Sequence, residues 1–210
     1  MNQEEKFLQF KERISTGEVY DSSDEEMLAF QGELVEKLHE LNQTSETPEG
    51  LKRREELLRE CLGTYGEGLY IVPPIQANWG LKNVHVGKNV VINFNVMFVD
   101  DVDITIGDDC MIGPNCCLVT AEHPISPILR KHKYQMNRPV RLENNVWLGA
   151  GVIVLPGVTI GENSIIGAGS VVTHDIEANV IAFGTPAKVY RSITKEDDEK
   201  YQEIIESLTK

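Results

Sequence analysis

His123 is the residue of this chain best suited to proton transfer, and it stands between Glu122 and Pro124. The unperturbed pKa of an imidazole lies near neutrality, so a histidine can take a proton from a hydroxyl at physiological pH. Glu122 is a poor partner for it, because adjacent residues of an extended chain point to opposite faces. The sequence therefore predicts a general base that is not paired with its neighbouring carboxylate.

The sequence gives less support for a metal site or for reactive cysteines than for a histidine base. Three imidazoles on one zinc ion need two of them close together in sequence, whereas His123 and His132 are nine residues apart and His85 lies far upstream. No cysteines form the CxxC pairs of a zinc site, and a disulfide framework is typical of short secreted chains. We predict no metal site and expect small buried apolar residues at Cys61, Cys110, Cys116 and Cys117.

An internal repeat predicts the elements that must position His123. Aliphatic residues recur every six positions, and glycine follows several of them directly. The series is Leu142, Leu148, Val154, Ile160, Ile166 and Val172, with Gly149, Gly161 and Gly167 behind three of its members. A period of six fits neither a helix nor simple strand alternation and indicates a short strand and a turn, repeated. Three such sides close a coil whose aliphatic positions point inward, and stacked coils bury one apolar column.

The repeat is broken in two places, around residues 100–103 and 121–138. Upstream of the second break the same spacing appears in Val86, Ile92 and Phe98 and, displaced by two, in Ile106, Ile112 and Leu118. A solenoid is only a scaffold, so function is sought where the repeat is interrupted. His123 lies in the second interruption, and a loop that projects from a rigid coil can reach a neighbouring subunit.

Helical patterns flank the repeat on both sides. Residues 1–66 form a predicted helical cap, with helices at 3–14, after a capping box of Ser23 with Glu26, and after Thr47 with its following proline. Residues 67–192 form the predicted β-helix with its protruding loop 121–138, and residues 193–210 a final helix capped by Thr194. Both ends of a solenoid need covering, because an open last coil exposes strand edges and the apolar column.

Charge and composition exclude several classes of partner. A net charge of −13 argues against a nucleic-acid ligand, which clustered Lys and Arg would hold. The N-terminus lacks the apolar region of a secretory signal, and no run of 18 apolar residues occurs. We therefore expect a cytoplasmic protein that binds neither nucleic acid nor membrane.

Together these motifs resemble a known enzyme subgroup. The matching segments, in unbroken order from about Pro73 to Arg191, include NFN at 93–95, VDD at 99–101, IGD at 106–108, GPN at 113–115, HP at 123–124, NNVWLG at 144–149, PGVTIG at 156–161 and IGAGSVVT at 166–173. They are similar to the maltose, galactoside and nodulation-factor O-acetyltransferases of the hexapeptide-repeat acyltransferases. This resemblance, and not the spacing, implies a left-handed parallel β-helix.

The resemblance also implies an activity and a set of roles. It implies a homotrimer with sites between subunits, in which an acceptor hydroxyl of a small sugar-like molecule attacks acetyl-CoA directly. His123 then matches the catalytic base, Asn93 the residue that stabilises the oxyanion, and Asp101 an acceptor-binding carboxylate. Trp147 matches a tryptophan near the thioester, although packing of the wall is the role we favour for it. The positions matching acetyl-CoA contacts are Ala150, Ala168, Thr173, Lys188 and Arg191.

The sequence departs from the subgroup at several of these places. His174 stands where a lysine usually contacts the cofactor, and we retain it as a cofactor-binding candidate. Asp21 is a stand-in for an N-terminal acceptor-binding acid, and Gln135 replaces an apolar acceptor contact. Three readings stay open beside the sugar acetyltransferase: a xenobiotic or amino-acid acetyltransferase, a non-catalytic β-helix scaffold, and a γ-type carbonic anhydrase. The last would need the three imidazole ligands considered above.

Overall fold

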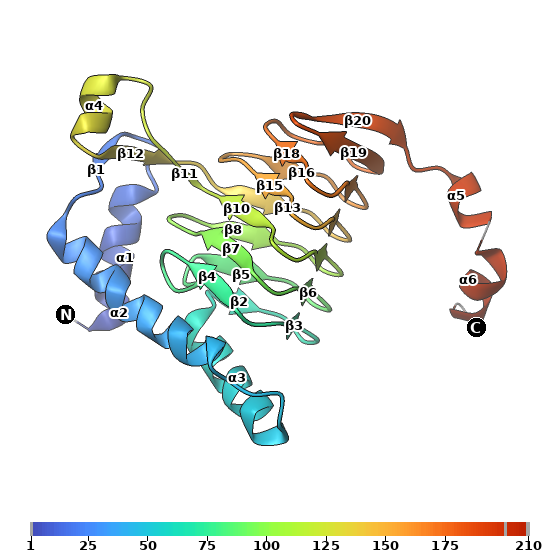
Figure 1. Ribbon diagram of the computed structural model, residues 1–210, viewed down its shortest axis with the longest axis horizontal. Coiled ribbons are helices and arrows are strands. Elements are labelled where there is room, and N and C mark those ends of the chain that lie inside the picture. Colours follow the sequence, from blue (N-terminus) through green and yellow to red (C-terminus); the bar gives the residue numbers. More distant parts are fainter. Residues whose placement is uncertain (1, 200, 209–210) are drawn as a thin grey trace.

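The computed structural model describes residues 2–199 and 201–208 and shows a parallel β-helix preceded by three helices (Figure 1). These helices are α1 (Gln3–Ile14), α2 (Glu25–Asn42) and α3 (Pro48–Cys61). Thr47 caps α3 as expected, since its side chain accepts a hydrogen bond from the Gly50 amide. The expected capping box of Ser23 is wrong: Asp24 caps α2 by accepting from the Met27 amide, which a carboxylate at a helix N-terminus does well.

Three flat faces make up the β-helix, and we name each after a central strand. The β10 face has the order β18-β15-β10-β7-β4, the β13 face β16-β13-β8-β5-β2, and the β14 face β20-β19-β17-β14-β9-β6-β3. Neighbouring strands pair in parallel throughout, apart from the antiparallel β19 and β20.

The strands of these faces are short. In the β10 face they are β4 (Ile75–Ala77), β7 (Val96–Val99), β10 (Cys117–Val119), β15 (Ile153–Val154) and β18 (Val171–Val172). In the β13 face they are β2 (Thr64–Tyr65), β5 (Val84–Val86), β8 (Ile104–Ile106), β13 (Val140–Leu142) and β16 (Thr159–Ile160). In the β14 face they are β3 (Tyr70–Ile71), β6 (Val91–Ile92), β9 (Met111–Ile112), β14 (Trp147–Leu148), β17 (Ile165–Ile166), β19 (Val180–Gly184) and β20 (Ala187–Ser192).

The repeated aliphatic residues fill the interior as the six-residue period predicts. Leu148 pairs in register with Ile112 on one side and Ile166 on the other, and all three are buried. Three of the cysteines join this core as expected, while Cys117 is only half-buried; no disulfide joins them. Burial raises the pKa of the Cys110 thiol to about 11, because a thiolate is poorly solvated there.

The outward rows of the three faces differ in chemistry. On the β14 face, the in-register outward residues are apolar: Tyr70, Val91, Met111, Trp147, Ile165 and Ile181. The row of the β10 face begins with the polar Gln76 and continues with the apolar side chains of Met97, Cys117, Ile153 and Val171. The β13 face presents Thr64, His85, Thr105, Arg141 and Thr159. Two faces are thus largely apolar outside and the third is polar.

Residues 121–138 fold into a small unit that joins the N-terminal segment to the β-helix. Strand β11 (Ala121–Glu122) pairs with β12 (Tyr134–Asn137), and β12 pairs in turn with β1 (Tyr20–Asp21). The short helix α4 (Pro127–Lys131) lies between β11 and β12. The loop that carries His123 therefore supplies two strands of a three-stranded antiparallel sheet, β12 in the middle and β11 at the edge.

At the other end the chain forms two short helices, α5 (Lys195–Glu199) and α6 (Gln202–Leu208), where we expected one. They do not cover the last coil as predicted, because both lie well away from the β-helix (Figure 1). The β19–β20 hairpin continues the β14 face at this end instead. Among the residues that the structure describes, no helix has the length and apolar character required to cross a bilayer.

Candidate active site

Two corners of the β-helix border the β10 face, and they carry half of the predicted site residues: Asn93, Asp101, His123, Ala150 and Ala168. We call residues 93–95, 113–115, 149–151 and 167–169 the stacked corner; they precede the strands of this face. We call residues 100–103 and 120–139 the open corner; they follow β7 and β10. The stacked corner keeps the repeat, and the open corner contains both of its interruptions.

In the open corner, one hydrogen bond fixes the imidazole of His123. Its Nδ1 lies 2.7 Å from the backbone carbonyl oxygen of Tyr134. A carbonyl can only accept, so Nδ1 carries the proton and Nε2 of the neutral ring is left as the basic atom. The Tyr134 backbone is held by β1, through its pairing with Asp21. Glu122 binds Arg138 at 2.9 Å instead.

His123 shares a cleft of about 390 Å³ with Asp101. The walls come from the N-terminal segment, the first coils and the loop: Ser22, Ser23, Leu28, Gln31, Asn78, Asp101, His123, Lys133 and Gln135. All of these side chains except that of Leu28 are polar, so the cleft suits a ligand with several hydrogen-bonding groups. Sequence reasoning missed Ser22 and Lys133, because only the pairing of β1 with β12 brings them here.

Two amides orient the Asp101 carboxylate, which is 5% exposed. Asn78 Nδ2 donates to Oδ2 at 3.1 Å and Gln135 Nε2 donates to Oδ1 at 3.0 Å. Gln135 Nε2 also lies 2.6 Å from the hydroxyl oxygen of Tyr20, whose pKa burial raises to about 12. The carboxylate is thereby held in place while it keeps lone pairs for further donors.

The neighbouring Asp100 is fully buried. Its Oδ1 accepts from the Trp79 amide at 2.8 Å, and its carbonyl accepts from Asn83 Nδ2 at 2.8 Å. Asn83 also donates to the Asp101 carbonyl at 3.3 Å. Burial raises the pKa of Asp100 to about 8, because desolvation penalises the ionised form. Asp100 thus anchors the backbone that presents Asp101.

Asp21 lies beside this cleft without lining it. Its Oδ1 accepts from the Ser23 amide at 2.9 Å and from the Ser23 hydroxyl at 2.6 Å, which lowers the pKa of the carboxyl. The side chain is exposed and closes a local turn. An acceptor role for Asp21 stays a prediction, and the structure assigns this carboxylate a turn-forming contact.

On the stacked corner, Ala150 and Ala168 lie in successive coils, and the coil of residues 113–115 lies between Ala150 and Asn93. A Cβ on Gly149 would come within 2.7 Å of the Ala168 amide nitrogen, and one on Gly113 within 2.8 Å of the Ala150 amide nitrogen. This close stacking makes a narrow column with backbone groups at its surface. Asn93 Oδ1 accepts from the Phe94 amide at 2.9 Å, so the amide nitrogen is the part of this side chain available to donate to a ligand.

One chain does not bring His123 and Asn93 together. Asn93 precedes strand β7 and His123 follows strand β10, so they lie at opposite ends of the β10 face. A strand of four residues separates such ends by about 13 Å. The residues predicted to act on the acceptor and those predicted to hold the acetyl group thus occupy different corners.

Comparison with known proteins agrees with this architecture. Family models match at residues 13–66 (maltose acetyltransferase hexapeptide capping motif), 103–126 (hexapeptide repeat of succinyl-transferase) and 139–174 (bacterial transferase hexapeptide). A galactoside O-acetyltransferase of Lactococcus lactis is 50% identical over 195 residues, which cover 92% of this chain and 93% of the relative. The chain belongs to the maltose and galactoside O-acetyltransferases. A galactoside O-acetyltransferase of Escherichia coli is 44% identical over 73% of this chain and 75% of its own.

Solved structures show the same relationship. A maltose O-acetyltransferase from Clostridium difficile superposes with a TM-score of 0.83 at 38% identity, over 88% of this chain and 97% of that one. A galactoside acetyltransferase in complex with coenzyme A superposes with a TM-score of 0.84 at 39% identity, over 90% of this chain and 93% of the other. The predicted β-helical fold and the predicted enzyme class are thereby confirmed.

The remaining cofactor candidates of this acetyltransferase lie toward the last coils. Thr173 Oγ1 and His174 Nδ1 are 2.8 Å apart in an exposed turn after β18. Lys188 and Arg191 lie on β20 and are exposed. Arg191 forms two 2.7 Å contacts to the Asp197 carboxylate. This guanidinium therefore binds a planar anion already, and a cofactor phosphate would compete with Asp197 for it.

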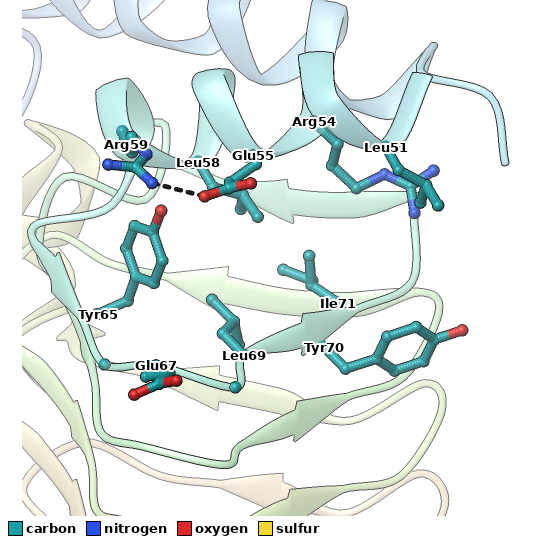
Figure 2. Close-up of a pocket in the computed structure, with 12 residues that line it drawn as sticks. Leu51, Arg54, Glu55, Leu58, Arg59, Tyr65, Glu67, Leu69, Tyr70 and Ile71 are labelled. Atoms are coloured by element: carbon teal, nitrogen blue, oxygen red, sulfur yellow. Dashed lines mark hydrogen bonds and ion pairs between the residues drawn. The ribbon is translucent and has the colours of Figure 1, made fainter. Parts of the chain in front are cut away.

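A larger cavity of about 610 Å³ lies apart from all of these residues, between α3 and the first coil (Figure 2). Apolar side chains such as Leu58, Leu69 and Ile71 point into it, and the Arg59–Glu55 ion pair lies at its rim. None of the predicted site residues lines it. Within the described ranges, no three potential metal ligands of the His, Cys, Asp or Glu type come together.

Proposed function

We propose that this acetyltransferase transfers the acetyl group of acetyl-CoA to a hydroxyl of a small, sugar-like acceptor, with His123 as the general base. The observation that carries the proposal is the hydrogen bond from His123 Nδ1 to the Tyr134 carbonyl, in a cleft shared with Asp101. It leaves a basic Nε2 beside a carboxylate that can hold acceptor hydroxyls. The names of the relatives support the acceptor class, and the neighbour that binds coenzyme A supports the donor.

The chemistry is a direct displacement. His123 Nε2 takes the proton of the acceptor hydroxyl while its oxygen attacks the thioester carbonyl of acetyl-CoA. The amide of Asn93 donates to the oxyanion of the tetrahedral intermediate. The carbon–sulfur bond then breaks, the imidazolium returns its proton to the departing CoA sulfur, and the acetyl ester and free CoA leave.

The same proposal requires a trimer, because the two groups of site residues lie at opposite ends of the β10 face. A ring of three copies needs two different patches on each copy, one for each neighbour. The outward rows of the β10 and β14 faces are apolar except for Gln76, as buried contact surfaces largely are. Trp147 on the β14 face is 47% exposed in the single chain. Packing these faces against neighbours would bring the stacked corner of one copy to the open corner of the next.

The test is a His123→Ala variant, assayed by CoA release with glucosyl, galactosyl and maltosyl acceptors. Loss of a general base lowers the rate by about 10²- to 10⁴-fold. His132→Ala is the matched control, since His132 ends α4 in the same loop and does not line the cleft. Unchanged acetyl transfer by folded His123→Ala would show that His123 is not the base.

A further inference from the structure

The C-terminal segment carries an apolar row that its own chain leaves open. Tyr201, directly before α6, and Ile204 and Leu208 on α6 follow one another at helical spacing and are 59%, 60% and 80% exposed. A helix this short is not stable in water by itself and needs a surface to pack on. The Arg191–Asp197 ion pair joins the start of the segment to β20. We therefore expect this apolar row to pack against a surface outside its own chain.

The charge of this segment restricts what that surface can be. Residues 195–208, which we call the acidic tail, contain six Asp or Glu and two Lys, a net charge of −4. An acidic helix with an apolar row is complementary to a surface that combines exposed aliphatic side chains with cations.

The loop 121–138 offers this combination. Ile125 is 93% exposed and Ile128 71% exposed. The loop holds four Lys or Arg and one Glu, a net charge of +3. Of its cations, Arg138 binds Glu122, whereas the described structure contains no ion pair for Arg130, Lys131 or Lys133.

The other basic region is already neutralised. On α3, Arg53 binds Glu40 and Glu56, Arg54 binds Glu46, and Arg59 binds Glu55. These arginines have little to gain from further carboxylates, because each already has a partner. The loop is thus the better match for the acidic tail.

We propose that the acidic tail of one copy docks on the loop 121–138 of a second copy, with the Tyr201, Ile204 and Leu208 row over Ile125 and Ile128. Contact within one chain is ruled out by distance along the molecule, since the tail and α4 lie on opposite sides of the β-helix (Figure 1). The inference rests on the trimer of the proposed function and adds a second contact between its subunits.

The docking would stabilise the cleft of His123 and Asp101 through the backbone of Tyr134. The loop supplies both His123 and the carbonyl that fixes its tautomer. A neighbour's tail packed on α4 would hold this loop against the β-helix and order it. Each copy would then stabilise the base of the next.

A disulfide trap in the full chain tests the contact. Ile128→Cys and Ile204→Cys are made as single variants, co-expressed and oxidised, with each single variant alone as the control. The expected result is a band of two chains on a non-reducing gel that forms only when both variants are present. An intrachain cross-link in the double variant would contradict docking between copies. The absence of a cross-link in a protein that sediments as a trimer would also contradict it. So would a cross-link between Ile204→Cys and Leu51→Cys on α3.

Charge reversal gives an independent measure. Lys131→Glu is expected to weaken the association of subunits about fivefold, the value of an exposed ion pair, and Glu203→Lys in the same chain to restore it. Sedimentation over a range of concentrations measures both. Absence of restoration would contradict the pairing of charges. Acetyl transfer, assayed alongside, separates failure of the docking from failure of the proposed function: a trimer with full activity and no cross-link overturns the docking alone.

Discussion

The stacked corner and the open corner border the same face of the β-helix, yet they are held in different ways. On the stacked corner each coil supports the next through close backbone contact, as where Gly149 meets Ala168. On the open corner the chain leaves the repeat and is anchored from outside. Asp100 is tied to Trp79, and Asp103 is bound by Lys11 of α1.

In the proposed function, this difference separates two tasks. A regular column of small residues suits a long, narrow ligand such as a pantetheine arm, because every coil repeats the same surface. An acceptor cleft must present unlike groups in one place, so it needs side chains from several elements, here Asp101, Gln135 and His123. The β-helix therefore keeps its repeat at one corner and breaks it at the other.

After His123→Ala, the largest effect on the open corner is expected for Asp101→Ala. It removes the carboxylate and leaves the Asn78 and Gln135 donors without this acceptor. A hydrogen bond to a charged group contributes about 1.5–3 kcal/mol, so kcat/KM for the acceptor should fall about 10- to 100-fold. KM for acetyl-CoA should not change. Steady-state kinetics with each substrate varied in turn measure this. If kcat/KM for the acceptor and kcat/KM for acetyl-CoA fell equally because KM rose for both substrates, the two corners would not bind different substrates.

A pair of glycine variants probes the stacked corner. Gly149→Ala forces a Cβ to within 2.7 Å of the Ala168 amide nitrogen and should cost about 2–3 kcal/mol of unfolding free energy. The Cβ of Gly151→Ala would have no atom within 4 Å, so only the positive φ of 70° destabilises this variant, by about 1 kcal/mol. Denaturant unfolding of both variants gives the comparison. Equal losses would mean that close stacking is not what holds this corner.

The smallest effect is expected for Asp103→Asn. Its carboxylate binds Lys11 Nζ at 2.6 Å and His85 Nε2 at 3.0 Å, and these hydrogen bonds lower its pKa to about 2. Because the group is partly exposed, we expect a loss of only about 1 kcal/mol.

The pH dependence of the Asp103 contribution follows from the direction of the shift. A carboxyl with a folded-state pKa below its unfolded value stabilises the fold above the unfolded value, 3.8, and this contribution is lost as the pH falls toward about 2. Urea unfolding at pH 7 and pH 3 should therefore show a smaller gap between the wild type and Asp103→Asn at pH 3. A constant gap would exclude an ionic origin.

The regular part of the molecule could be predicted from sequence, and the open corner only in part. A period of six fixes which side chains face inward, so the buried positions of Leu148 and Ile166 follow directly. The tautomer of His123 could not be foreseen, because its partner is a backbone carbonyl placed by the pairing of β1 with β12. The acidic tail was expected to cover the last coil. Its apolar row predicts that it packs on a surface, but not which surface.

Mixed trimers test the central claim, a site completed by two copies, most directly. His123→Ala and Asn93→Ala, each inactive alone, are unfolded together, refolded as an equal mixture and assayed for acetyl transfer. If His123 of one copy works with Asn93 of its neighbour, random assembly restores an intact site at about one quarter of the positions. The account predicts about a quarter of the wild-type activity; a mixture as inactive as its components would contradict it.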